Sequence, residues 1–192
     1  MFSQKAIFLD RDGTINVEKD YLYRIADFEF LPNVTNALRL LQDAGYLLII
    51  LTNQSGIARG YYNEDDFQKL NSWMIKQLSD YGVKISAVYY CPHHPNAKIE
   101  KYKIDCVCRK PKLGMFEEAI TDFDIDLERS YTIGDKIRDC SICKTTNCRG
   151  FLISNNENIE IINSVKRGYY ERVEYANDLF TAANKILGLS II

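Results

Sequence analysis

The chain has 192 residues, of which 46% are hydrophobic and 26% charged, and its formal net charge is −2 at pH 7. This composition supports a buried core and excludes wholesale disorder. Lys and Arg form no block, which argues against a protein that binds nucleic acid along a basic face. No apolar run is long enough for a membrane span or a signal peptide. We therefore expect one cytoplasmic domain, 1–192, that contacts neither nucleic acid nor membrane, and we expect it to be a monomer.

Apolar runs of strand length alternate with helical patterns along the chain. The runs predict strands at residues 5–9, 46–51, 85–90, 130–133, 151–153 and 169–173. Apolar residues at intervals of three and four predict helices at residues 34–44, 64–81, 115–120, 137–145, 155–163 and 177–187. Asn33 and Asn63 are expected to cap the first two helices, which Gly45 and Gly82 end. This α/β order predicts a three-layer parallel sheet with helices on both faces, no large cap domain, and ligands outside the carboxyl ends of the strands.

Two acidic residues follow the first predicted strand. Asp10 and Asp12 are two residues apart, so in an extended chain their side chains could lean toward the same side. One carboxylate could attack phosphorus to give an aspartyl-phosphate, while the other protonates the leaving oxygen and later activates water. Short motifs have many chance matches, and the alternative is a pair of solvated acids in a turn.

The other predicted strand ends carry residues that suit the same chemistry. Asp135 could complete a Mg²⁺ site with the Asp10 carboxylate and the backbone carbonyl of Asp12, because hard cations prefer oxygen ligands. Thr52 offers a hydroxyl and Lys110 a cation to phosphoryl oxygens. Taken singly, Thr52 could be a turn residue and Lys110 a surface lysine.

These segments resemble the four signature segments of the haloacid dehalogenase superfamily of phosphohydrolases, at residues 10–14, 52–53, 110 and 134–136. The resemblance extends from about residue 5 to residue 150. It implies a nucleophile (Asp10), a general acid/base (Asp12), two phosphoryl stabilisers (Thr52 and Lys110) and a Mg²⁺ ligand (Asp135). It also places Lys136, which could neutralise or orient Asp10, in the same site.

Residues 91–111 show no clear period and are expected to form a long loop that something must hold. Three thiols and one imidazole in this loop make a closed tetrahedral set for structural Zn²⁺, contributed by Cys91, His93, Cys106 and Cys108. His94 is the rival ligand to His93, and the alternative is a loop with reduced thiols. A metal that fixes the last two cysteines would also fix where Arg109 and Lys110 project.

Within the superfamily, residues 52–62, 90–95 and 106–111 closely resemble the heptose bisphosphate phosphatase branch. This resemblance implies removal of the 7-phosphate of D-glycero-D-manno-heptose 1,7-bisphosphate, which leaves heptose 1-phosphate for nucleotide-activated heptose biosynthesis. It implies substrate contacts from Glu18, Lys19, Asp20, Tyr21, Asn53, Gln54, Ser55, Arg59, Arg109 and Lys136. Arg109 would recognise the end of the sugar that is not cleaved. The rivals are histidinol-phosphate phosphatase, which usually has a shorter loop between its zinc-binding pairs, and a zinc-stabilised binding protein without catalysis.

The chain departs from the branch pattern at several positions. Asp20 and Asn33 stand where glycine is usual, and Leu113 stands where proline is usual. Near the C-terminal end of the resemblance, three cysteines replace small residues and are expected to pack in the core rather than bind a second metal: Cys140, Cys143 and Cys148. Asp139, four residues past Asp135, could orient Lys136 or face solvent.

Overall fold

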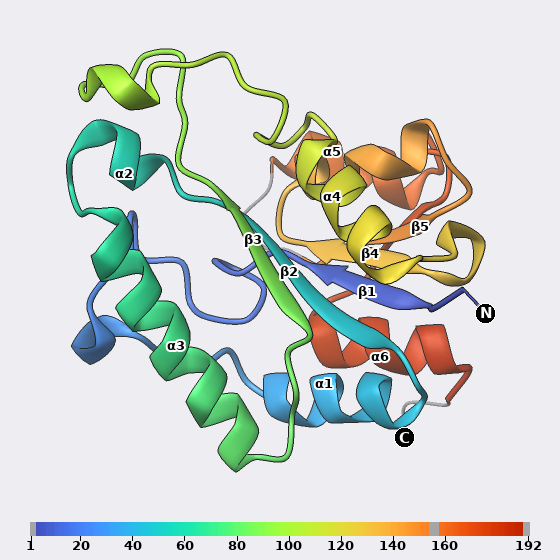
Figure 1. The fold of residues 1–192 in the computed structure, drawn as a ribbon. Helices are drawn as coiled ribbons and strands as arrows, with labels where there is room; N and C mark the ends of the chain where they lie inside the picture. Colours follow the sequence, from blue (N-terminus) through green and yellow to red (C-terminus); the bar gives the residue numbers. More distant parts are fainter. Residues whose placement is uncertain (1–2, 154–157, 190–192) are drawn as a thin grey trace.

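The described residues fold around a six-stranded parallel sheet (Figure 1). The structure, a computed structural model, describes residues 3–153 and 158–189. The strand order is β3-β2-β1-β4-β5-β6, and every adjacent pair is parallel. The strands are β1 Ala6–Leu9, β2 Leu47–Asn53, β3 Ala87–Cys91, β4 Tyr131–Gly134, β5 Arg149–Leu152 and β6 Val173–Tyr175. Their carboxyl ends meet at one edge, below α2 and the long loop that follows β3 (Figure 1).

Helices cover both faces of this sheet. Residues of α1, α3 and α6 pack into the core on one face, and residues of α4, α5 and the 3₁₀ helix η4 pack on the other. The α-helices are α1 Val34–Asp43, α2 Ser55–Arg59, α3 Glu64–Asp80, α4 Gly114–Phe123, α5 Ile159–Lys166 and α6 Leu179–Leu187, and η4 is Ile137–Lys144. The predicted three-layer α/β fold is confirmed. Among the described helices, none is both long and apolar enough to cross a membrane.

The central strand shows how the sequence produces these layers. All four residues of β1 are at most 1% exposed, because helices lie over both faces. Ile7 and Leu9 face the core with α1 and α6, whereas Ala6 and Phe8 face the opposite core. The strand ends at Leu9 and Asp10 follows it, so the buried strand brings a carboxyl group to the edge where ligands bind.

Two segments near that edge differ from prediction. Residues 52–56 were expected only to break the strand, but β2 continues through Asn53 and the five-residue helix α2 follows at once. A helix this short is below the length at which periodicity can be read. Residues 137–144 form a 3₁₀ helix with a non-helical residue at Cys140, rather than a regular α-helix. The expected packing of the three cysteines holds, since Cys140, Cys143 and Cys148 are at most 2% exposed and lie in one core cluster.

The predictions for the C-terminal part were wrong in position. The helix expected at 155–163 is α5, which begins at Ile159; residues 155–157 lie outside the described part of the chain. Asn158 caps it, because its side chain accepts the Glu160 N–H at 2.7 Å. The strand expected at 169–173 is β6, which begins only at Val173. Tyr169 is 74% exposed, so the aromatic run that suggested a strand belongs to the preceding turn.

The expected cap of α1 was wrong in its chemistry. Asn33 occupies the cap position, but its backbone is left-handed (φ 59) and its side chain makes no capping hydrogen bond. A left-handed residue with a Cβ is strained by about 1 kcal/mol, less for Asn than for most residues. We expect Asn33→Ala to lower the free energy of unfolding by about 1 kcal/mol, whereas Asn33→Gly holds it level or raises it. Urea unfolding of both variants, with the exposed α1 variant Asn36→Ala as control, tests this, and equal destabilisation by Ala and Gly would contradict it.

Candidate active site

A buried lysine joins three elements at the carboxyl edge of the sheet. Lys110 is only 3% exposed, and its Nζ lies 2.7 Å from Oδ1 of Asp10 and 2.7 Å from Oδ1 of Asp139. It also donates to the backbone carbonyl of Leu51 in β2 at 2.6 Å. Burial alone would lower the pKa of Lys110, but the two carboxylates outweigh burial and raise it. The lysine therefore stays charged at the centre of the site.

Three buried carboxyl groups surround this ammonium group. Carboxylate oxygens of Asp10, Asp135 and Asp139 lie within 4.8 Å of one another. Burial raises the pKa of Asp10 to about 7 and that of Asp135 to about 8, where Asp10 and Asp139 add to the effect. Among the described residues, no group donates a hydrogen bond to Oδ2 of Asp135. A buried cluster with more carboxylates than cations and an oxygen that accepts no hydrogen bond fits a hard divalent cation.

Two glycines make room for these carboxyl groups. Gly13 has φ +79, and a Cβ there would lie 2.5 Å from Oδ2 of Asp135. A Cβ on Gly134 would lie 2.3 Å from the Cβ of Asp139. The Lys136 N–H donates to Oδ2 of Asp139 at 2.9 Å and so fixes that carboxylate at the start of η4. The glycines of the two signature segments are thus required by close approach.

Asp12 is not a member of this cluster and lines a neighbouring pocket. Its carboxylate accepts hydrogen bonds from Arg11 at 2.8 Å, from Asn16 at 3.0 Å and from Gln54 at 3.0 Å. Arg11 is fully buried and also donates to the carbonyl of Leu22. The two acids of the motif therefore have separate surroundings, one beside the buried lysine and one beside the pocket.

Gln54 links the two halves of the site. Its Nε2 donates to Oγ1 of Thr52 at 2.7 Å as well as to Asp12, and its Oε1 accepts from the Tyr62 hydroxyl at 2.5 Å. Thr52 is 1% exposed, and because its oxygen accepts from Gln54, its own hydroxyl hydrogen can point elsewhere. The Thr52 hydroxyl is thereby available to donate to a further acceptor.

The pocket beside Asp12 has a volume of about 180 Å³ and carries opposite charges. Burial raises the pKa of Glu18, and the nearby Asp12 and Asp20 carboxylates add to this effect. Burial lowers the pKa of Arg109, and the positive charge of Arg138 contributes. The pocket thus offers carboxylates for hydroxyl groups and guanidinium groups for an anion. Its lining comprises Asp12, Glu18, Asp20, Tyr21, Asn53, Gln54, Ser55, Gly56, Tyr62, Arg109 and Arg138.

The long loop after β3 brings together the four predicted metal ligands. Cys91, His93, Cys106 and Cys108 have ligand atoms within 4.8 Å of one another. The Cys108 Sγ lies 2.9 Å from that of Cys91, 3.2 Å from that of Cys106 and 3.4 Å from Nδ1 of His93. His94 is not part of this group; its Nδ1 accepts the Asn96 N–H instead. Three sulfurs and one imidazole nitrogen fit tetrahedral Zn²⁺.

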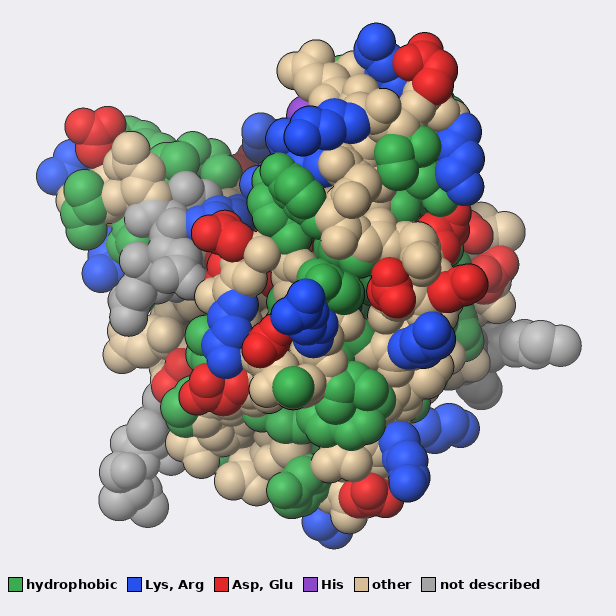
Figure 2. All heavy atoms as spheres, turned by 90° about the vertical axis from the view of Figure 1, so that its left-hand side faces the viewer, with side chains coloured by type: hydrophobic (Ala, Val, Ile, Leu, Met, Phe, Trp, Pro, Cys, Tyr) green, Lys and Arg blue, Asp and Glu red, His purple; other side chains and the backbone are tan. Residues whose placement is uncertain are grey.

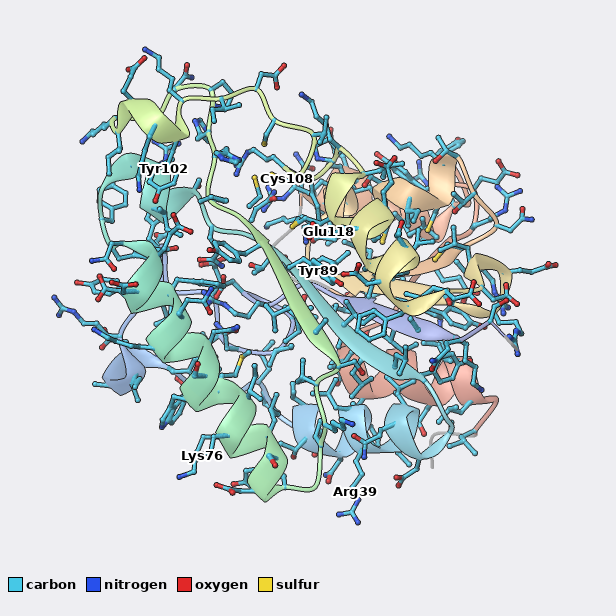
Figure 3. All side chains as sticks on the ribbon, viewed as in Figure 1. Arg39, Lys76, Tyr89, Tyr102, Cys108 and Glu118 are labelled. Carbon is cyan, nitrogen blue, oxygen red and sulfur yellow. The ribbon has the colours of Figure 1, made fainter. Side chains whose placement is uncertain are left out.

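The far part of the same loop rests on α3. Tyr102 and Tyr90 both donate their hydroxyl groups to the Glu64 carboxylate. The N–H groups of Lys98 and Ile99 donate to the carbonyl of Ala58 in α2 at 3.0 and 3.1 Å. Figure 3 shows Tyr102 above α3 and Cys108 nearer to α4, at the two parts of the loop. The loop is therefore held at both places, and its one short helix is the 3₁₀ turn Glu100–Tyr102.

Comparison with known proteins places this arrangement in a family. A family model described as polynucleotide kinase 3 phosphatase matches residues 5–165. A D-glycero-beta-D-manno-heptose-1,7-bisphosphate 7-phosphatase from Haemophilus ducreyi is 52% identical over 143 residues, which are 74% of this chain and 78% of that protein. The enzyme of the same name from Escherichia coli K12 is 46% identical over 145 residues, 76% of each chain. The chain belongs to this family of haloacid dehalogenase superfamily phosphatases.

A solved structure agrees with this membership. The D,D-heptose 1,7-bisphosphate phosphatase from B. bronchiseptica, solved with magnesium and phosphate, superposes with a TM-score of 0.81. It is 28% identical, and the match covers 96% of this chain and 99% of that one. This protein is accordingly a phosphatase with the superfamily fold, as the four signature segments indicated.

Most of the residues that the resemblance assigned to this phosphatase lie together. Asp10, Lys110 and Asp135 share the buried cluster, and the pocket lining includes most of the expected substrate contacts. Lys19 lies outside that lining; its Nζ donates to the carbonyl of Asp27 and pairs with Glu29 at 3.2 Å.

Two more of the expected substrate contacts are not among the residues that line the pocket. Arg59 lies with its Nη2 3.4 Å from Nε2 of His94. Lys136 was expected to neutralise or orient Asp10, but its Nζ lies 3.8 Å from Oδ2 of Asp135, and Lys110 contacts Asp10.

Three residues of the site were missed or left open by sequence reasoning. Asp139 is 1% exposed, so it does not face solvent. Its position three residues after Lys136 at the start of a helix is a capping signal that could have indicated its orientation. Arg11 lies between the two acids of the motif, which was a usable hint of an ion pair. Nothing in the local sequence marks Arg138 as a pocket residue, since its place depends on how η4 meets the long loop.

Proposed function

We propose that this phosphatase removes the 7-phosphate of D-glycero-β-D-manno-heptose 1,7-bisphosphate and leaves heptose 1-phosphate. The observation that carries the proposal is the charged pocket beside Asp12, whose lining contains two guanidinium groups as well as carboxylates. The relatives at 46–52% identity that bear this activity in their names support it. Arg109 and Arg138 favour a substrate with an anionic far end over histidinol phosphate, whose far end is an imidazole ring and which has no second phosphate.

In the first step, a carboxylate oxygen of Asp10 attacks phosphorus and the bond from phosphorus to the sugar oxygen breaks. The leaving oxygen takes a proton from Asp12, whose side chain reaches the pocket. In the second step, Asp12 takes a proton from water, the water oxygen attacks phosphorus, and Asp10 is released with inorganic phosphate. Lys110 and the Thr52 hydroxyl stabilise the oxygens of the transferring group.

We propose that Mg²⁺ binds at the carboxylates of Asp10 and Asp135 and the backbone carbonyl of Asp12. When bound, it would offset the repulsion between the carboxylate nucleophile and the phosphate. Asp139 lies in the same cluster and holds Lys110. The Oδ2 of Asp135, which is buried and accepts no hydrogen bond from the described residues, supports this assignment.

We also propose that the cysteine and histidine cluster binds structural Zn²⁺. Its four ligand groups fill a tetrahedral site and leave no position for water. The metal would act on catalysis indirectly, because Arg109 and Lys110 directly follow the ligand Cys108.

The proposal is tested by phosphate release from a panel of substrates with Mg²⁺. The panel contains both anomers of heptose 1,7-bisphosphate, histidinol phosphate and a 3′-phosphorylated oligonucleotide, which the family description suggests. We expect the β-anomer to have the highest kcat/KM. Preference for histidinol phosphate or the oligonucleotide would overturn the substrate assignment and keep the chemistry. On the face shown in Figure 2, Lys and Arg side chains are interspersed with Asp and Glu.

Arg138 provides a sharper test of recognition of the second phosphate. We expect Arg138→Ala to raise KM for heptose 1,7-bisphosphate about tenfold, because a charge-assisted hydrogen bond to a phosphate is lost. KM for heptose 7-phosphate, which lacks the second phosphate, should stay unchanged. Lys144→Ala, an exposed residue of η4 outside the pocket lining, is the matched control. Equal losses on both substrates would show that Arg138 does not read the second phosphate.

A further inference from the structure

Asn53, the last residue of β2, uses both polar atoms of its side chain on a distant part of the chain. Its Nδ2 donates to the backbone carbonyl of Lys110 at 3.1 Å, and its Oδ1 accepts the backbone N–H of Lys110 at 3.1 Å. The resemblance assigned Asn53 to the substrate pocket, whose lining it does join. Its amide group is nevertheless occupied by the main chain 57 residues away.

The other end of Lys110 is anchored to the same strand. Its Nζ donates to the carbonyl of Leu51, two residues before Asn53, and contacts Asp10 at 2.7 Å. Lys110 therefore contacts β2 at two residues. Its backbone is hydrogen-bonded to the side chain of Asn53, and its ammonium group is hydrogen-bonded to the backbone carbonyl of Leu51. Thr52, the second phosphoryl stabiliser, lies between these two anchors.

This double anchoring matters because a lysine side chain has a flexible stem that does not define its own position. The segment that carries Lys110 arrives from a loop whose described part contains only one short 3₁₀ helix, Glu100–Tyr102. Cys91, which pairs in register with Asn53, belongs to the cysteine cluster that holds Cys106 and Cys108. Two independent ties, one through sulfur ligands and one through the Asn53 amide, thus fix the backbone of Lys110 at the edge of the sheet.

We propose that Asn53 is a positioning residue that acts on phosphoryl transfer through Lys110, and not through contact with the sugar. This inference rests on the proposed role of Lys110 as a phosphoryl stabiliser. A displacement of about 1 Å of a group that contacts the transition state can cost on the order of 100-fold in rate. Loss of the amide clamp therefore lowers kcat, whereas loss of a sugar contact would raise KM.

A double-mutant cycle separates the two roles. We expect Asn53→Ala to lower kcat for the heptose bisphosphate about 10- to 100-fold with little change in KM. In the Lys110→Ala background, the same substitution should change kcat less than about twofold, because the group that it positions is already gone. If Asn53 contacts the sugar, its effect will persist at full size in that background. Arg109→Ala, run through the same cycle, is the comparison for a residue that acts on the sugar end.

The same variants are also assayed with p-nitrophenyl phosphate, which has no sugar. Asn53→Ala should lower kcat on this substrate by a similar factor, since Lys110 acts on every phosphoryl group. An unchanged rate would overturn the inference. If the native protein hydrolyses p-nitrophenyl phosphate but not the heptose bisphosphate, only the substrate assignment fails, and the cycle on the aryl ester still decides the role of Asn53. Circular dichroism and Asn53→Asp, which keeps the acceptor for the Lys110 N–H, distinguish mispositioning from unfolding.

Discussion

Replacing Asp10 by Asn is expected to lower phosphate release by at least about 10⁴-fold, the scale seen when a catalytic nucleophile is removed. An amide oxygen is a poor nucleophile, and no other carboxylate in the cluster takes its place, because Asp139 is tied to Lys110 and the Lys136 N–H. Phosphate release from the preferred substrate with saturating Mg²⁺ measures this. When a reaction with substrate labelled in the transferred phosphoryl group is quenched with acid, label should remain bound to the native protein as the aspartyl-phosphate. No label should remain bound to the variant.

The variant should fold normally, so that the loss is chemical. Asn has the same shape as Asp, and Lys110 keeps its second carboxylate partner in Asp139. The substitution also removes one of several buried like charges, whose repulsion contributes to the raised pKa of Asp10 and Asp135. We expect an unchanged or slightly higher Tm, with the exposed Asp80→Asn as control. Activity that survives in Asp10→Asn would show that Asp10 is not the nucleophile.

The site residues that could be predicted are those marked by a local sequence pattern, namely polar residues that directly follow a predicted strand. A short apolar run followed by acidic residues predicts a buried strand with a charged residue just after it. The structure has this arrangement in β1 and Asp10. In a parallel sheet, such ends meet at one edge, so residues far apart in sequence can be assigned to one place. The ends of three predicted strands thus assign Asp10, Thr52 and Asp135 to the same edge of the sheet.

The rest of the site depends on contacts that no local pattern contains. Lys110 reaches Asp10 across 100 residues, and its partner Asp139 lies on a 3₁₀ helix that was expected to be a regular helix. Lys19 matched the pattern of a pocket residue, yet its flexible stem found Asp27 and Glu29 instead. Side-chain direction in loops is decided by the nearest available partner, and that partner is known only once the loop is folded.

Removal of the predicted zinc tests how far the folded loop sets the positions of the site residues. We expect removal of the metal with 1,10-phenanthroline, in the presence of excess Mg²⁺, to lower kcat/KM by about 100-fold or more, and Zn²⁺ to restore it. Without the metal, Cys106 and Cys108 lose the tie that fixes the two cations after them, and mispositioned charges cost rates of this order. The sheet should stay folded, because strands and helices supply most of its two cores even though Cys91, Cys106 and Cys108 belong to or pack against one of them. The Tyr90 and Tyr102 contacts with Glu64 do not need the metal either.

Cys108→Ser makes the same test without a chelator. It should lose zinc and activity together, while Cys148→Ser, a buried cysteine outside the metal cluster, should keep its zinc even if its stability falls. Asn53 holds the backbone of Lys110, which lies two residues after the zinc ligand Cys108. Metal loss and Asn53→Ala should therefore impair the same step, and their effects on kcat should combine less than multiplicatively. A metal-free protein with full activity would mean that the Asn53 clamp alone positions Lys110, and that the zinc serves only the loop.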